Sequence, residues 1–307
     1  MKKIYTLLLA SIILTSIQAQ SIDLSFKLEK GEEYKHITST KSTVAQNMMG
    51  QDINMTMTVN GATSFIVKDN TNDNYEMDAT YDELSMTIEM PQGKQSYSSE
   101  VSDVNDQVSS LLRNIKGKTI EVVMSKTGKV KEVRNTKVLE QTINESFEQL
   151  PEEERAQVKA QVMEAFGDET IKRNMESVSG IYPDKPVKKG DKWIIDTSID
   201  GDVKIKLSTE YELVDFTSEY ALIKGYATIE PLDSETASMI PMNFEFSGSQ
   251  IAEIKVDVTT GWIIDAQITQ EIEGEVEMNM GENQEIKGME GGMKISMKMV
   301  QETVITN

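Results

Sequence analysis

Apolar and polar residues alternate over long stretches of this chain, which is the pattern of strands that bury one face. The run Ile53-Asn54-Met55-Thr56-Met57-Thr58-Val59 places its apolar side chains on one face and asparagine and threonine on the other. Residues 84–90 and 251–258 alternate in the same way, and turns rich in Gly, Asp and Asn separate such runs. The alternation predicts long antiparallel strands with one wet face and one buried face.

The hydrophobic period changes to a helical one between residues 136 and 179. Pro151 opens a second helix within this segment, Gly167 ends it, and Asp168 begins a third. A further amphipathic helix is predicted over residues 100–115. A sheet of this length must curl or split. We therefore expect an α+β, mostly β fold, in which helices inserted mid-chain pack on a curled, half-barrel-like antiparallel sheet.

The first residues have the order of a secretory signal peptide. Met1-Lys2-Lys3 precedes an apolar run over residues 4–14, and small and polar residues follow up to Ala19. The run is shorter than the roughly 20 apolar residues of a spanning helix. We expect cleavage after Ala19, so that residues 20–307 form one exported β-rich domain, periplasmic or extracellular. No later segment is apolar enough to span a membrane, and without cysteine the mature chain cannot carry an N-terminal lipid anchor of the lipoprotein type.

Two flanking segments begin with a similar turn. Residues 30–34 read Lys-Gly-Glu-Glu-Tyr, and residues 189–193 read Lys-Gly-Asp-Lys-Trp. One interpretation is that residues 20–135 and 180–307 are pseudo-repeated halves joined by the helical segment 136–179. The alternative is that strand-turn-strand units resemble one another by chance.

Composition excludes several classes of function. The formal net charge of −20 disfavours nucleic acid as a partner, because such binding depends on Lys and Arg contacts.

His36, the single histidine, has no accompanying nucleophile motif and is interpreted as a surface or strand residue. Trp193 and Trp262 each follow a glycine turn and are interpreted as core anchors. The loop of residues 69–74 carries oxygen ligands but departs from the EF-hand pattern, and hairpin chemistry explains it. We predict no catalytic residue, metal or cofactor.

Methionine is unusually abundant, with 19 residues, many of them at strand spacing. Core packing explains this spacing first, because such methionines share a sheet face with other apolar residues. The second explanation is a concave face that accepts apolar ligands, since thioether chains are flexible and polarizable. Binding of Cu(I) through the M-x-M pairs ranks third. The predicted ligand-lining residues are Met55, Met57, Met86, Ile88, Met90, Met278, Met280, Met297 and Met299.

Two motifs resemble landmarks of a known family. Phe26-x-Leu28-x-x-Gly31-x-x-Tyr34 stands near the mature start, and Pro183-x-x-Pro186-Val187-x-x-Gly190-Asp191-x-Trp193 stands mid-chain. Both are similar to motifs of an uncharacterised family of exported bacterial envelope proteins of about this length. That family implies no activity and no catalytic residue. The overall pattern is also similar, more loosely, to the half-barrel fold of bacterial lipoprotein carriers, which is an analogy of fold alone.

These observations lead to two hypotheses on function. The first is a non-enzymatic envelope protein whose concave, Met-lined sheet face binds a hydrophobic or lipid-like molecule. The second is a structural or interaction module of the envelope, with a filled core, no small ligand and another envelope protein as partner. An enclosed apolar volume in the fold distinguishes the first hypothesis from the second.

Overall fold

The computed structural model describes residues 21–48, 51–71, 73–103, 106–148, 150–153, 155–156, 159, 162, 166–199, 205–231, 242–278 and 293–307. The predicted signal peptide, residues 1–19, lies outside the described residues.

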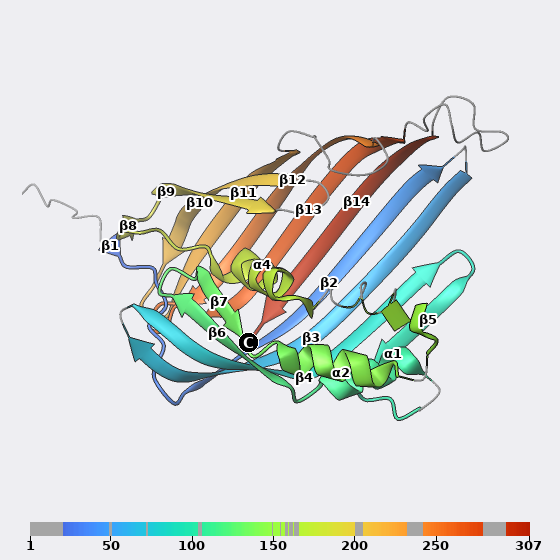
Figure 1. The fold of residues 1–307 in the computed structure, drawn as a ribbon. Coiled ribbons are helices and arrows are strands. Elements are labelled where there is room, and N and C mark those ends of the chain that lie inside the picture. Colours follow the sequence, from blue (N-terminus) through green and yellow to red (C-terminus); the bar gives the residue numbers. More distant parts are fainter. Residues whose placement is uncertain are drawn as a thin grey trace, which may run out of the picture.

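One large antiparallel sheet dominates the described part of the chain, and the predicted fold class is confirmed (Figure 1). The strands run in the order β7-β6-β4-β3-β2-β14-β13-β12-β11-β10-β9, and β5 pairs with β4. Pairing of β2 with β14 joins the N-terminal strands to the C-terminal ones. Their bounds are β2 Glu33–Met48, β3 Gln51–Thr71, β4 Asn74–Met90, β5 Gly93–Ser98, β6 Thr119–Ser125, β7 Val130–Arg134, β9 Lys192–Ile199, β10 Ile205–Phe216, β11 Tyr220–Pro231, β12 Met242–Asp257, β13 Ile263–Met278 and β14 Met293–Thr306.

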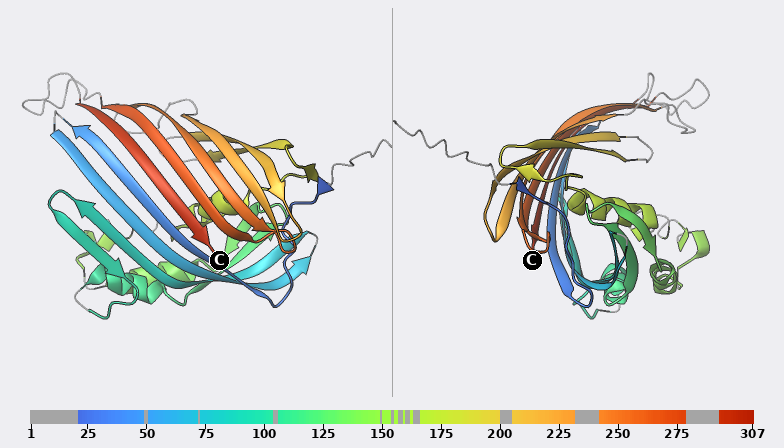
Figure 2. Two further views of the ribbon diagram at one scale, coloured as in Figure 1. Left: turned by 180° about the vertical axis from the view of Figure 1, so that it is seen from behind. Right: turned by 90° about the vertical axis from the view of Figure 1, so that its left-hand side faces the viewer.

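Seen end-on, the sheet curls around the helices, which lie on its concave side (Figure 2). The helices that the structure describes are α1 (Gln107–Ile115), α2 (Lys137–Ser146) and α4 (Asp168–Ser179). The predicted start of a helix at Asp168 is confirmed, and Gly167 is its N-cap residue.

The helix predicted over residues 100–115 is too long at its N-terminal end. α1 begins at Gln107, where the Asp106 side chain accepts a hydrogen bond from the Ser109 backbone N–H at 3.0 Å. Upstream, the Ser99 backbone N–H still donates to the Leu84 carbonyl at 2.8 Å and prolongs the ladder between β4 and β5. Pairing with a neighbouring strand therefore overrides the apolar spacing that suggested a longer helix.

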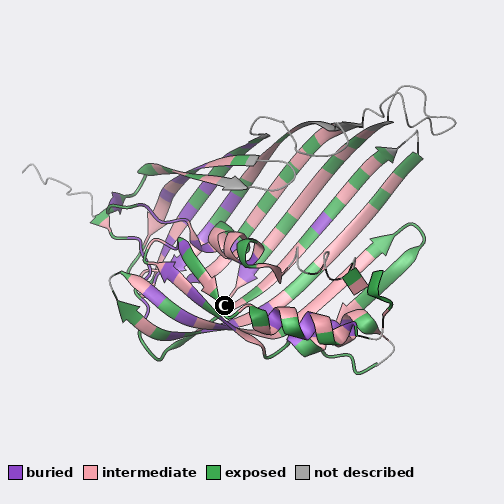
Figure 3. Ribbon diagram, viewed as in Figure 1, coloured by how far each residue is buried: buried purple, intermediate pink, exposed green. Residues whose placement is uncertain are grey.

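The helices cover only part of the concave face. β3 has 21 residues and spans about 70 Å at strand rise, whereas the 12 residues of α4 span about 18 Å. Buried residues accordingly gather at the end of the sheet that is covered by α4 and by the N-terminal segment, residues 23–32. At the other end, the strands alternate between exposed and half-buried residues (Figure 3). The uncovered end remains accessible on both faces.

The N-terminal segment locks two hairpin turns together. The backbone N–H of Phe26 donates to the Lys126 carbonyl at 2.7 Å, and the backbone N–H of Lys27 donates to the Thr260 carbonyl at 2.8 Å. Just before this N-terminal segment, β1 (Ser21–Ile22) pairs with β8 (Val187–Lys188). The segment thus connects the N-terminal and C-terminal halves of the sheet at its covered end.

The two Lys-Gly-acid turns have the same local geometry. Gly31 and Gly190 adopt φ values of +89° and +86°. The Gly31 N–H donates to the Val67 carbonyl at 2.9 Å, and the Gly190 N–H donates to the Leu213 carbonyl at 2.7 Å. The matching turns agree with two related halves, and the duplication itself stays a prediction.

Replacing Gly128 with alanine tests how tightly the covered end is packed. Gly128 has φ +86°, and a Cβ there would lie 1.7 Å from the Ser179 carbonyl oxygen. We expect Gly128→Ala to lower the free energy of unfolding by at least about 3 kcal/mol, measured by urea titration. Gly190→Ala is the matched control, because Gly190 has the same φ and no atom near its would-be Cβ, and it should lose only about 1 kcal/mol. Equal losses would contradict this packing.

Candidate functional site

A largely apolar cavity of about 420 Å³ lies between α4 and the concave face of the sheet. Its volume falls in the range of small-molecule sites, which is roughly 300–1,000 Å³. The side chains come from β2, β3, β4, β6, β7, α4 and three adjoining positions. They are Phe26, His36, Thr38, Val59, Thr63, Phe65, Met77, Tyr81, Leu84, Val122, Met124, Val130, Phe166, Ile171, Asn174, Met175, Val178, Ser179 and Trp262.

The register of the strands explains which side chains form the floor. His36 on β2 stands opposite Thr63 on β3, and Thr63 stands opposite Tyr81 on β4. Directly opposed residues of antiparallel strands point to the same face. His36, Thr63 and Tyr81 therefore form one polar row across a floor that is otherwise mainly apolar.

The roof is the apolar face of α4, which carries Ile171, Met175 and Val178. The C-terminal end of this helix is anchored, because the Ser179 hydroxyl can donate its one proton to the Gly128 carbonyl at 2.7 Å, with the Met175 carbonyl as the alternative acceptor at 2.9 Å. α4 is thus held over the sheet at one end, and its apolar side chains face the floor across the cavity.

His36 is half-buried and lies in an aromatic cage. Its ring stacks on Trp262 at a centroid distance of 4.3 Å and meets the edge of Phe65 at 5.7 Å. Trp262 is itself fixed, since its indole N–H donates to the Lys35 carbonyl at 3.0 Å. Burial lowers the pKa of His36 to about 4, so the imidazole is neutral at pH 7. Its Nε2 atom is buried and has no hydrogen-bond partner.

Tyr81 forms the other end of the polar row. Its ring meets the edge of Phe166 at a centroid distance of 6.2 Å, which links the sheet to the segment that precedes α4. Burial raises the pKa of its phenol to about 12, so the hydroxyl keeps its proton. The lining residues include no Asp, Glu, Lys or Arg, and the cavity therefore suits an uncharged ligand.

The predicted Met-rich set lies beyond the cavity on the same face. Register pairs Met57 with Ile88 and Val59 with Met86, and Val59 also lines the cavity. Val44 pairs with both Met55 and Met299. Except for Met90, which is 40% exposed, the members whose side chains are described are half-buried. They are Met55, Met57, Met86, Ile88, Met297 and Met299.

None of the nine predicted residues lines the 420 Å³ cavity. Met278 ends β13, but its side chain lies outside the described residues, as does the whole of Met280. Their ligand-lining role stays a prediction. The sequence reasoning missed the row of His36, Thr63 and Tyr81, although His36 continues the alternating strand that begins near Tyr34.

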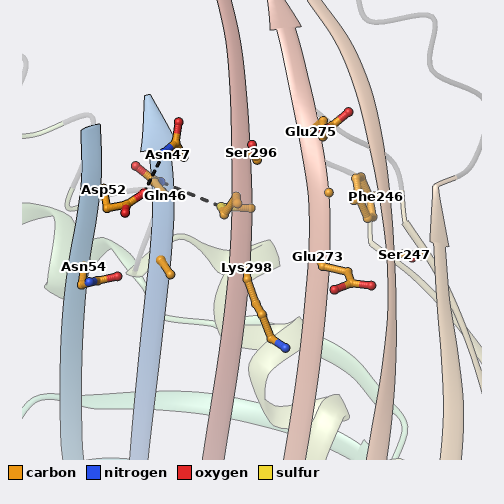
Figure 4. A pocket seen from close by; sticks show the side chains of 13 residues that line it. Gln46, Asn47, Asp52, Asn54, Phe246, Ser247, Glu273, Glu275, Ser296 and Lys298 are labelled. Atoms are coloured by element: carbon orange, nitrogen blue, oxygen red, sulfur yellow. Dashed lines mark hydrogen bonds between the residues drawn. The ribbon is translucent and has the colours of Figure 1, made fainter. Parts of the chain in front are cut away.

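A second hollow, of about 910 Å³, lies near the uncovered end of the sheet (Figure 4). By register most of its side chains, such as Asp52, Glu273 and Lys298, belong to the face opposite the methionines. Asn47 donates to Asp52 at 2.6 Å within it. Most of these residues form the ordinary wet face of an antiparallel sheet, whereas Phe246 and the predicted residue Met297 reach the hollow, a broad open trough, from the methionine face. The apolar cavity is the better candidate site, because it is more enclosed and contains a buried unpaired nitrogen.

The fold and the cavity define a β-rich protein with an apolar site under a helix. A family model matches residues 72–263, and the chain belongs to this family, DUF6263, a family of unknown function. This confirms the predicted membership of an uncharacterised family. No curated protein matches the chain. Within the residues that the structure describes, no helix is long and apolar enough to cross a membrane.

Solved structures show only weak similarity. Lipovitellin, in a structure titled for its lipid–protein interactions, is 6% identical with a TM-score of 0.47 over 91% of this chain, which spans only 25% of lipovitellin. An outer membrane channel from Pseudomonas putida F1 is 8% identical with a TM-score of 0.23, covering 91% of this chain and 97% of the channel. The outer membrane protein OprG from Pseudomonas aeruginosa is 5% identical with a TM-score of 0.21, covering 90% and 96%. Scores this low do not define a shared fold.

The buried imidazole makes stability depend on pH. The folded state favours the neutral imidazole, so His36 makes its full contribution to stability above its ordinary pKa of 6.5. This contribution is lost as the pH falls towards the folded-state pKa of about 4. Between pH 7 and pH 5 we expect His36 to remove about 2 kcal/mol from the free energy of unfolding. The variant His36→Gln has no titrating side chain at this position, so its free energy of unfolding should not show this decrease. Parallel pH profiles for both proteins in urea titrations would count against a neutral, buried His36.

Proposed function

We propose that this chain is an exported, non-enzymatic envelope protein that binds an elongated apolar molecule between α4 and the concave face of its sheet. The observation that carries the proposal is the cavity of about 420 Å³ with a mainly apolar lining and no ionic side chain. The basic and apolar N-terminal pattern supports export. The lack of catalytic motifs in the sequence supports a role in binding.

Energetics favour an occupant. Interiors of proteins are packed almost without voids larger than a water molecule. This cavity is partly open and far larger than such voids, so solvent or a ligand occupies it. A filled-core structural module, the competing hypothesis, is disfavoured by this volume.

The methionine-lined face extends the proposed site. Val59 belongs to the cavity and pairs with Met86, so apolar surface continues from the cavity towards Met57 and Ile88 without interruption on these strands. Flexible thioether side chains can adapt to apolar chains of different shape. An extended, lipid-like molecule would thus lie with one part under α4 and the remainder along this face.

A bulky side chain in the roof tests the proposal. Val178 lines the cavity from α4, and Val178→Trp should fill part of the volume. We expect at least about tenfold weaker binding of the apolar fluorescent probe phenylnaphthylamine, because roughly 1.4 kcal/mol of contact energy is lost. The readout is the rise in probe fluorescence on titration.

Val304→Trp is the matched control. Val304 is on β14 with 40% of its surface exposed and points to the opposite face. This variant should bind the probe as the wild type does. If the wild type fails to bind the probe, or if both variants lose binding equally, the proposed site is wrong.

A further inference from the structure

The cavity contains a polar atom that nothing in the protein satisfies. Nε2 of His36 is buried and unpartnered, whereas buried polar atoms in folded proteins almost always have a hydrogen-bond partner. The imidazole is among the lining groups of the cavity, but Nε2 itself has almost no accessible surface while the cavity is empty. A bound molecule reaches this atom when a neighbouring side chain gives way, and it then supplies the missing partner.

Water is a poor candidate for that partner. A buried water normally makes about three hydrogen bonds to polar groups. Around the imidazole, Trp262 occupies one ring face at 4.3 Å and Phe65 lies edge-on at 5.7 Å. The indole N–H of Trp262 already donates to the Lys35 carbonyl. A water beside Nε2 would rely on the hydroxyls of the polar row for its other bonds, and Nε2 has almost no accessible surface for it in the empty cavity.

The imidazole is also held in a defined position. His36 lies on β2, where it pairs with Thr63 of β3, and the pairing of β2 with β14 begins at the next residue, Ile37. Stacking on the fixed indole restricts the rotation of its ring. A donor or acceptor fixed in this way can recognise one group of a ligand without paying for its own ordering.

The surroundings decide the charge of the recognised group. The lining holds no acidic or basic side chain that could compensate an ionised ligand group, and transfer of such a group into an apolar site is strongly unfavourable. The imidazole itself is neutral at pH 7, since burial lowers its pKa to about 4. An uncharged ligand group that hydrogen-bonds to the neutral imidazole suits both the lining and the imidazole.

We infer that the ligand is an apolar chain carrying one uncharged hydrogen-bonding group, such as a hydroxyl, which pairs with Nε2 of His36. This inference rests on the proposed function and specifies its ligand class. Thr63 stands opposite His36 in the same polar row, and Tyr81 follows one strand further on. The rest of the ligand contacts the apolar side chains of the floor and of α4.

Three probes of equal length test the inference: decane, decanol and decanoate, each competed against phenylnaphthylamine at pH 7. We expect His36→Phe, which retains an aromatic ring beside Trp262, to weaken decanol about tenfold, because the hydroxyl would be buried without a partner. Decane, which has no hydrogen-bonding group, should lose less affinity than decanol does. His36→Gln keeps a hydrogen-bonding amide and should restore much of the decanol affinity. Decanoate should bind the wild type at least about tenfold more weakly than decanol.

The outcomes separate this inference from the proposed function. If decane and decanol lose affinity equally in His36→Phe, the hydrogen bond is refuted although apolar binding stands. Decanoate bound as tightly as decanol would refute the uncharged group. If no probe binds the wild type, the proposed function itself fails. Retained decane binding also shows that the variant is folded, and His36→Leu replaces His36→Phe if the latter does not fold.

Discussion

The fold depends on covering one long apolar sheet face with helices that are much shorter than the strands. Alternation makes the same face mainly apolar along most long strands, whereas at the junction of β2 and β14 this face carries the polar pairs Thr40–Thr303 and Ser42–Gln301. α4 offers only 12 residues against the 21 of β3. The sheet curls around the helices, but its concave face is fully covered only near the N-terminal segment and the hairpin turns at Lys126 and Thr260. The remaining apolar surface stays exposed or half-buried.

The cavity forms where this cover is partial. α4 is anchored at its C-terminal end through Ser179 and faces the sheet across a space that its own side chains do not fill. The sheet places His36 in that space beside a fixed tryptophan. In the proposed function, specificity arises from the contrast between a mainly apolar lining and one neutral polar group. The same arrangement accounts for the low pKa of His36 and for its unpaired nitrogen.

Local patterns were sufficient for much of the fold and for little of the site. Period-two alternation predicted the strand segments of β3, β4 and β12, and the sequence around Gly167 predicted where α4 begins. The start of α1 was misplaced, because strand pairing at Ser99 is a long-range contact that helical spacing cannot reveal. His36 was interpreted as a surface or strand residue. Its strand position is correct, but its burial depends on Trp262, which is 226 positions away in the chain, and on α4.

The central claim is that a ligand-accessible apolar space exists between α4 and strands β2–β4. Xenon occupies apolar cavities without requiring any specific chemistry. A crystal of the protein pressurised with xenon should show bound xenon beside Trp262 and Met175, under α4. Absence of xenon there, with side chains from α4 packed directly on the sheet, would contradict the account.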